Sequence, residues 1–326
     1  MKKILLSLAF CFLSFSAFSI SLNDFSLSVE PVFGMKWGRL DEYVYAKDSN
    51  GDHQKQSELN WPIKNMISVG GNIYGGYKKL NGVFHFSTLI PGNSGKMSDS
   101  DWMDLTDLKT TYSKSENSIE KAIDFSVLLK YDFRPITCIK IAPSFEFEYK
   151  TISFEANNGY GWYGHKVSPH VAWDNPKAIY YDSGSLCGID YKREVTQIFI
   201  GYYLEYQPIE KLRLFETFSI CPYAYTVSYD THYSNMKKTS GTNYADEVKF
   251  YFSRLKGSAG CYYALNSIVE FGLTLSVFYS VEKTGTNYQK SLSQKSYTNM
   301  TEAKGVEGGA GAFEFDAALS CKINIF

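Results

Sequence analysis

After residue 19 the sequence contains no run of about 20 uncharged apolar residues, the length that a transmembrane helix requires. It also lacks an excess of either charge, because 33 Lys and Arg residues nearly balance 34 Asp and Glu residues, so nothing indicates nucleic-acid binding. There is no His-x-x-x-His motif and no cysteine cluster that would suggest a metal site. We therefore expect no metal ion, no other cofactor and no nucleic-acid partner.

The N-terminus has the features of an export signal. Lys2 and Lys3 precede an apolar run over residues 4–18, and Ala17-Phe18-Ser19 places small residues at positions −3 and −1 of a cleavage site. This pattern predicts a signal peptide over residues 1–19 and a single mature domain over residues 20–326. A lipoprotein attached at Cys11 is less favoured, because the bulky Phe10 stands where a small residue is needed.

Aromatic residues are abundant in what remains. They make up 17% of the chain, with 26 Tyr and 23 Phe, although the mean hydropathy is negative at −0.24. An exported, aromatic-rich chain without a membrane helix suits an outer-membrane β-barrel, whose strands expose apolar side chains only at alternate positions. The alternative is a secreted β-sandwich, which also alternates.

The alternation favours the barrel. Four segments alternate between apolar side chains and side chains that include carboxylates and lysines: 124–133, 139–150, 269–280 and 313–325. One face therefore suits lipid and the other a polar lumen. Two cysteines, Cys221 and Cys321, fall on apolar rows, so we expect them to face lipid. Removal of Cys11 leaves five cysteines, an odd number that excludes a complete disulfide framework.

Segments of this kind predict an all-β, ten-stranded antiparallel transmembrane β-barrel with long extracellular loops. An even number of strands places both termini in the periplasm, with the short turns beside them and the long polar stretches outside. The compact turn signals are residues 79–82, 134–137, 207–211 and 264–267, and the polar stretches lie around 38–64, 91–122, 155–192, 230–247 and 284–308.

Two acidic clusters fall in these long stretches. Residues i and i+2 of an extended chain project from the same face, so Asp99 lies beside Asp101, and Asp230 beside His232. A carboxylate next to an imidazole fixes its tautomer and strengthens it as a base. If Tyr229 and the aromatic row before it face outward, Asp230 and His232 point into the barrel mouth.

Each cluster also has a simpler interpretation. An acidic triplet is often only a solvated loop or a surface cation site, and a single histidine is more often a loop residue than a base. No role is expected for the other histidines, which lack an acidic partner two residues away: His53, His85, His165 and His170.

The two clusters together resemble the omptin family of outer-membrane endoproteases. The resemblance is carried by the Asp-x-Asp-Trp-Met-Asp motif at 99–104 and by Asp-x-His at 230–232, in the family's order. Further matches lie at 42–45, 59–61 and 188–192. The resemblance implies an aspartic-type endopeptidase in the bacterial outer membrane, with its active site facing the cell exterior and polypeptides as substrates.

Roles for four residues follow from this resemblance. Asp230 would orient His232, and His232 with Asp99 would hold and deprotonate a water that attacks a peptide carbonyl. Asp101 would assist, sharing a proton with Asp99, because neighbouring carboxylates resist losing both protons.

Two departures from the family pattern concern substrate and lipid. Omptins that cut between basic residues carry acids at the floor of the pocket for the residue preceding the cut; Glu42 matches one, but Ser228 replaces the other. We therefore expect a weaker preference for basic residues, and Ser228→Asp to raise cleavage after Arg or Lys. The positions that grip lipopolysaccharide in enterobacterial omptins hold no arginine here, so dependence on that lipid is doubtful: Phe147, Tyr149, Thr151 and Glu194.

The alternative function is a catalytically silent outer-membrane barrel that serves as an adhesin or a porin. Charged side chains on the predicted inner face crowd a ten-stranded lumen and argue against conduction. They include Lys130, Glu146, Glu148 and Lys322.

Overall fold

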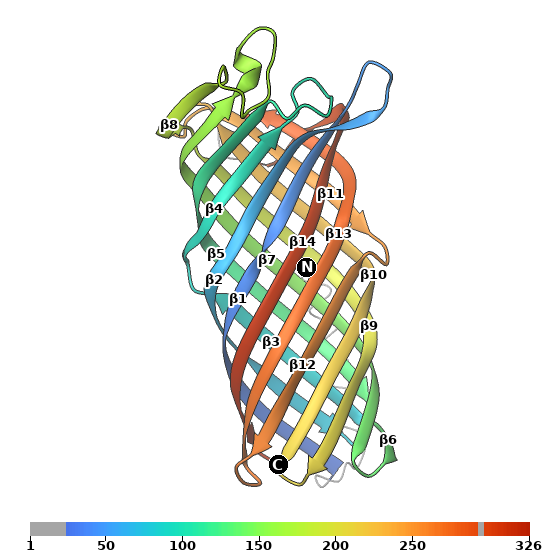
Figure 1. The fold of residues 1–326 in the computed structure, drawn as a ribbon. Coiled ribbons are helices and arrows are strands. Elements are labelled where there is room, and N and C mark those ends of the chain that lie inside the picture. The colour runs from blue at the N-terminus through green and yellow to red at the C-terminus, as the bar shows by residue number, and fades with distance from the viewer. Residues whose placement is uncertain (1–23, 293–296) are drawn as a thin grey trace.

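The computed structural model describes residues 24–292 and 297–326 (Figure 1). The predicted signal peptide at 1–19 lies outside these residues. The described chain is one fourteen-stranded antiparallel sheet, with a short 3-10 turn, η3, at Gly164–Lys166. In this part of the chain no helix is both long and apolar enough to cross a membrane. The predicted all-β, antiparallel class is confirmed.

The strand bounds are as follows. The first seven strands are β1 Phe25–Lys47, β2 His53–Tyr77, β3 Leu80–Leu89, β4 Gly92–Asp101, β5 Thr111–Tyr131, β6 Phe133–Ile136 and β7 Ile139–Tyr163. The remaining seven are β8 Ile179–Leu186, β9 Ile189–Ile209, β10 Leu212–Tyr233, β11 Gly241–Phe250, β12 Arg254–Ala264, β13 Val269–Ser291 and β14 Thr301–Asn324.

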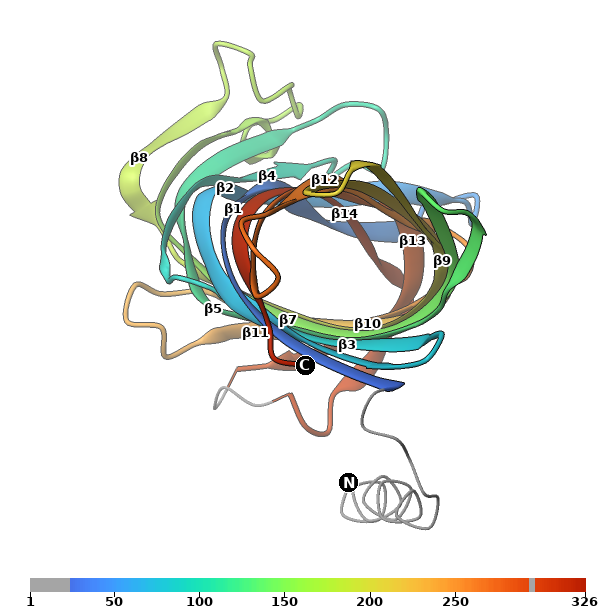
Figure 2. The same ribbon diagram turned by 90° about the horizontal axis from the view of Figure 1, so that it is seen from below.

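The strand pairings close into a ring, and the two views show a hollow cylinder (Figures 1 and 2). Strand β1 pairs with β2 on one side and with β14 on the other, joining the two ends of the described chain. The ring runs through ten strand positions. At two of these positions a pair of shorter strands takes the place of one long strand: β3 with β4 between β2 and β5, and β11 with β12 between β10 and β13. The short strands β6 and β8 are additions that pair with β7. The difference from the ten predicted strands comes from these divisions and additions.

The outer face of the cylinder is apolar over its lower and middle part. On β13, successive odd-numbered residues project outward, and each leaves at least 43% of its surface exposed in the isolated chain. They are Phe271, Leu273, Leu275, Val277 and Tyr279. The even-numbered residues between them, including the buried Glu270 and Phe278, face the interior. An apolar exterior around a polar interior is the arrangement that the alternation predicted.

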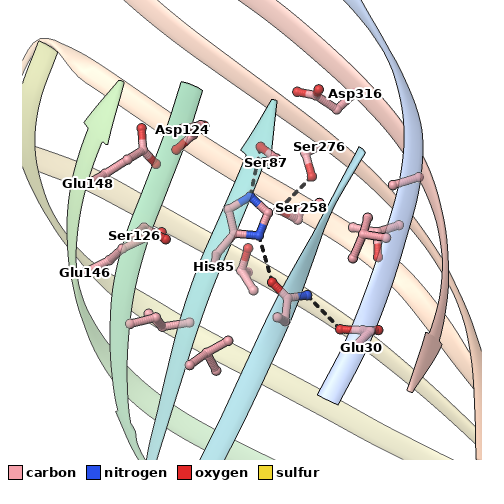
Figure 3. Close-up of a pocket in the computed structure, with 18 of the residues that line it drawn as sticks. Glu30, His85, Ser87, Asp124, Ser126, Glu146, Glu148, Ser258, Ser276 and Asp316 are labelled. Carbon is pink, nitrogen blue, oxygen red and sulfur yellow. Dashed lines mark hydrogen bonds between the residues drawn. The ribbon is translucent and has the colours of Figure 1, made fainter. Parts of the chain in front are cut away.

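The interior holds a cavity of about 550 Å³ that is lined by basic and acidic side chains in equal number among the described residues. Lys150 Nζ lies 3.1 Å from a Glu148 oxygen and 3.4 Å from Asp124, and Lys256 lies 2.6 Å from Glu148. Figure 3 shows His85 in the same cavity, bonded through its two ring nitrogens to Asn72 and Ser87. These side chains cross-link the strands by ion pairs and hydrogen bonds.

The loops at the upper end are shorter than predicted, because the strands continue above the apolar band. The predicted stretch at 38–64 is mostly strand, and only residues 48–52 connect β1 to β2. The stretch at 91–122 contains all of β4, so Asp99 and Asp101 lie on a strand rather than in a loop. Figure 1 shows β8 and the connections around it projecting at this end, opposite the C-terminus.

A bulge in β10 corrects the expectation for Cys221. Ile220 pairs with Ile200, but Tyr223 pairs with Ile198, so one extra residue interrupts the register. Below the bulge Phe218 faces outward, whereas above it the odd-numbered Tyr223 does. Cys221 lies at the change of face and is fully buried, with its thiol donating to the Tyr223 carbonyl at 3.1 Å. The prediction that it faces lipid is therefore wrong.

Candidate active site

Two strands on opposite sides of the ring carry the predicted site residues. Asp99 and Asp101 end β4, while Asp230 and His232 end β10, and both strand ends lie at the upper opening. On β10 the exposed apolar side chains of the outer face stop at Tyr223, well below Asp230. The site therefore lies above the apolar band.

Asp230 and His232 form a dyad. The Asp230 Oδ2 atom lies 2.5 Å from His232 Nε2, and the carboxylate is buried while the imidazole is partly exposed. Tyr244, the cross-strand partner of Asp230, places its ring edge-on to the imidazole at 5.4 Å. Because Nε2 is held by Asp230, Nδ1 is the ring nitrogen left to meet a substrate or a water.

The charge around His232 favours the imidazolium. Burial alone would lower the pKa of His232, but the charge and hydrogen bond of Asp230 and the charges of Asp99 and Glu42 raise it from 6.5 to about 10. His232 is therefore protonated at neutral pH.

Asp99 and Asp101 form the second pair. Ser57 Oγ donates a hydrogen bond to Asp99 Oδ1 at 3.4 Å, from the neighbouring strand β2. Burial and the charge of Asp101 hold the pKa of Asp99 well above its usual range, against the opposing charge of His232. Burial also raises the pKa of Asp101. The pair thus retains a proton at a pH where a solvated carboxyl group would have lost it.

His232 and Asp99 influence each other across the opening. Each one's charge shifts the pKa of the other, which places the dyad and the acid pair within interaction distance. The His232 imidazolium and the acid pair therefore act on each other electrostatically.

Below the dyad lie the two predicted substrate-binding residues. Glu42 is 2% exposed and accepts a hydrogen bond from Trp61 Nε1 at 3.2 Å. Burial, with the charges of Asp230 and Asp246, raises the pKa of Glu42 well above its usual range. Ser228 Oγ lies 3.0 Å from the Tyr191 hydroxyl and accepts from Arg193 Nε at 3.2 Å.

Two residues beside Ser228 were not predicted from the sequence. Asp246 is the cross-strand partner of Ser228 and accepts a hydrogen bond from Asn287 at 2.7 Å. Burial raises the pKa of Asp246 to about 7. Arg193 is the partner of Ser228 on the other side. Neither forms an i, i+2 pair with a predicted residue, and only the strand register, which the sequence leaves open, would have found them.

The third acid of the motif does not join the site. Asp104 lies beyond the end of β4, where its Oδ1 is 2.7 Å from Nδ1 of the exposed His170. His53 also has a distant acidic neighbour, Glu307, at 3.5 Å. The spacing rule used for these histidines found no partner because both acids come from remote parts of the chain.

A model of the omptin family matches residues 23–315 of the sequence, which is most of the chain. The chain belongs to the omptin family. Its fold is similar to that of the outer membrane protease OmpT from Escherichia coli, with a TM-score of 0.79 and 19% identity over 94% of this chain and 99% of that one.

A second solved structure is much less similar to this omptin. The translocator domain of the autotransporter NalP from Neisseria meningitidis covers 97% of this chain and 95% of its own, but with 8% identity and a TM-score of 0.37. No curated protein matches the chain in sequence.

Proposed function

We propose that this omptin is an endopeptidase of the bacterial outer membrane, built as a ten-stranded transmembrane β-barrel. The observation that carries the proposal is the Asp230–His232 dyad at 2.5 Å, facing the acid pair of Asp99 and Asp101 across the opening. Outer-membrane barrels keep their short turns in the periplasm. The opposite end, which holds the site, then faces the cell exterior, where it meets polypeptide substrates.

The protonation states support separate roles in hydrolysis, with the acid pair as the base and His232 as the acid. A water held between Asp99 and His232 gives its proton to the acid pair while its oxygen adds to the peptide carbonyl. His232 then donates its Nδ1 proton to the departing amine, and the carbon–nitrogen bond breaks. The acid pair returns a proton to His232 and restores the starting state. Asp99 suits the role of base because a carboxyl group with a raised pKa accepts a proton more readily near neutral pH.

The test is cleavage of a fluorescence-quenched peptide library by refolded protein. Asp99→Ala and His232→Ala should each lose at least about 100-fold in kcat/KM, the range expected for a general acid or base. Asp104→Ala is the matched control, since it removes an acid of the same motif that lies away from the site. No cleavage by folded wild type, across the library and with added lipid, would refute the protease and favour the silent barrel.

Independence from lipopolysaccharide is also proposed. Of the positions expected to grip the lipid, Phe147 is exposed on the outer face, while Glu194 accepts from Tyr149 at 3.4 Å and pairs with Lys192 at 2.6 Å. A carboxylate at this place repels phosphate, and the nearest cation is already paired. Detergent-folded protein should have the same activity with and without lipopolysaccharide, and strong activation by the lipid would contradict this.

A further inference from the structure

Arg193 spans the cylinder directly beneath the dyad. It rises from β9, and its terminal nitrogens donate to two carbonyl oxygens on the opposite wall, Asp41 O at 2.7 Å and Gly311 O at 2.8 Å. These two residues are paired neighbours on β1 and β14. Arg193 is 3% exposed, and these bonds make it a crossbar between the site above and the lumen cavity below, whose lining it also joins.

The position of this crossbar relates it to the substrate. Ser228, which accepts from Arg193 Nε, lies two residues before Asp230 on the same face of β10. That spacing puts the guanidinium roughly 7 Å below the dyad. Asp41 is the neighbour of Glu42, so the other end of the crossbar reaches the second predicted floor residue. Arg193 is thus bonded to one of the two predicted floor residues and to the chain neighbour of the other.

The acceptors of Arg193 are all neutral. They are the hydroxyls of Tyr191 and Ser228 and the two backbone carbonyls. An arginine keeps its charge at every pH at which proteins fold. The floor thus carries a fixed positive charge in the space that a cationic substrate side chain would need.

Position 228 lacks the expected acid, but the neighbouring strand β11 carries one, Asp246. Asp246 lies across from Ser228, and the space for its carboxylate exists because residue 308 is glycine, whose added Cβ would stand 1.8 Å from Asp246 Oδ1. Glu42 is the other acid beside the floor. The floor therefore has two carboxyl groups that could receive a cation, and an arginine of the chain itself bonds to Ser228, the strand partner of Asp246.

We propose that Arg193 fills the floor of the subsite for the residue preceding the cleaved bond and restricts that subsite to short, uncharged side chains. The proposal rests on the proposed peptidase activity and deepens it. Arg193 repels a substrate arginine or lysine and takes up the depth that such a side chain would occupy.

The same geometry changes the expectation for Ser228→Asp. The new carboxylate would lie beside Arg193 Nε and pair with it instead of remaining available to the substrate. Ser228→Asp should therefore raise cleavage after Arg or Lys only when it is combined with Arg193→Met.

The experiment compares kcat/KM for paired peptides that carry Arg or Ala before the cut. Wild type should favour Ala, and Arg193→Met should raise the Arg-to-Ala ratio at least about tenfold, since juxtaposed like charges are strongly unfavourable. Arg193→Lys keeps the charge and should keep the wild-type ratio. Adding Asp246→Asn to Arg193→Met should reverse part of the gain.

Arg254→Met is the matched control. Arg254 is another buried arginine of the lumen, bonded to the neutral oxygens of Gln197 and Thr226 one step lower on the wall. Its removal should leave the ratio unchanged. If Arg193→Met does not fold, Arg193→Gln replaces it, because an amide retains donors for the floor hydroxyls.

Two results would overturn the proposal while leaving the peptidase intact: wild type that cleaves best after Arg or Lys, or a folded Arg193→Met with an unchanged ratio. Absence of cleavage of every peptide by folded wild type would overturn the peptidase and the subsite together, so the two failures are distinguishable.

Discussion

At the residue scale, the environment of a side chain decides its role more than its presence in a motif does. Asp99 and Asp104 belong to one six-residue motif, yet Asp99 is held in the site with a raised pKa while Asp104 pairs with His170 outside it. Likewise His232 differs from the other histidines through the buried carboxylate of Asp230. Burial and neighbouring charge, which depend on the fold, therefore distinguish Asp99 from Asp104 and His232 from the other histidines.

The pH dependence of cleavage follows from these environments. The proposed mechanism needs His232 protonated, so wild-type kcat/KM should hold through neutral pH and fall as pH rises through the pKa of His232 at about 10. Asp230→Asn removes the largest of the interactions that raise this pKa, so the alkaline fall should move to lower pH. Activity at the optimum should also drop by about 10³-fold or more, as for the loss of the orienting acid in other hydrolases.

Peptide cleavage between pH 5 and 11 measures this profile, and NMR titration of His232 in substrate-free wild type checks the assignment. A wild-type activity that rises only as pH passes 10 would instead make neutral His232 the base and contradict the proposed division of labour.

At the element scale, one bulge in β10 sets the direction of the dyad. Below it the odd-numbered residues face inward, ending with Cys221, and above it the even-numbered ones do, including Asp230. Pro222 lies in this bulge and has no N–H to donate to a ladder, which suits a break in pairing. If Pro222 instead took a regular place in the ladder, every residue above it would change face, and Asp230 would point out of the cylinder.

Deletion of Val227, which lies between the bulge and the dyad, should therefore abolish the site, while Pro222→Ala retains the bulge and the activity. We expect the deletion to lower kcat/KM by at least about 100-fold, because a change of face removes both dyad residues. Heat-modifiable gel migration separates folded from unfolded protein, and peptide cleavage is then measured on the folded fraction. A folded deletion variant with wild-type activity would show that the register above the bulge adjusts independently.

At the scale of the whole molecule, the balanced charges of the lumen distinguish an enzyme from a pore. Lys36 pairs with Glu314 at 2.8 Å, Lys256 with Glu148 at 2.6 Å, and Lys140 with Glu205 at 3.4 Å, so the interior is crossed by ion pairs at several levels. Arg193 closes the top of the same cavity. Ion pairs that bridge the lumen in this way crowd it, so we expect it to conduct poorly.

We accordingly expect no steady ion current when the refolded protein is inserted into a planar bilayer. An open porin measured under the same salt and voltage provides the positive control, and peptide cleavage by the same preparation shows that the inserted protein is native. Reproducible current steps of defined size would instead support the porin interpretation.

The sequence by itself determined the features that depend on neighbours along one strand. Alternation predicted an all-β antiparallel fold with an apolar outside, and the i, i+2 spacing predicted that Asp230 lies beside His232, because backbone geometry fixes both periods. The motif also identified the family. The predicted loop lengths and the face of Cys221 were wrong, since strand extension and a bulge leave little trace in a pattern of side chains.

Only the tertiary structure decided which strands meet. Ring closure brings Asp99 on β4 toward His232 on β10, and the register of β9, β10 and β11 surrounds Ser228 with Arg193 and Asp246. These contacts join residues remote in sequence, and their distances depend on how the whole sheet curves and closes. The pairing of Asp230 with His232 could thus be predicted along one strand, whereas the residues around Ser228 depend on the register across strands.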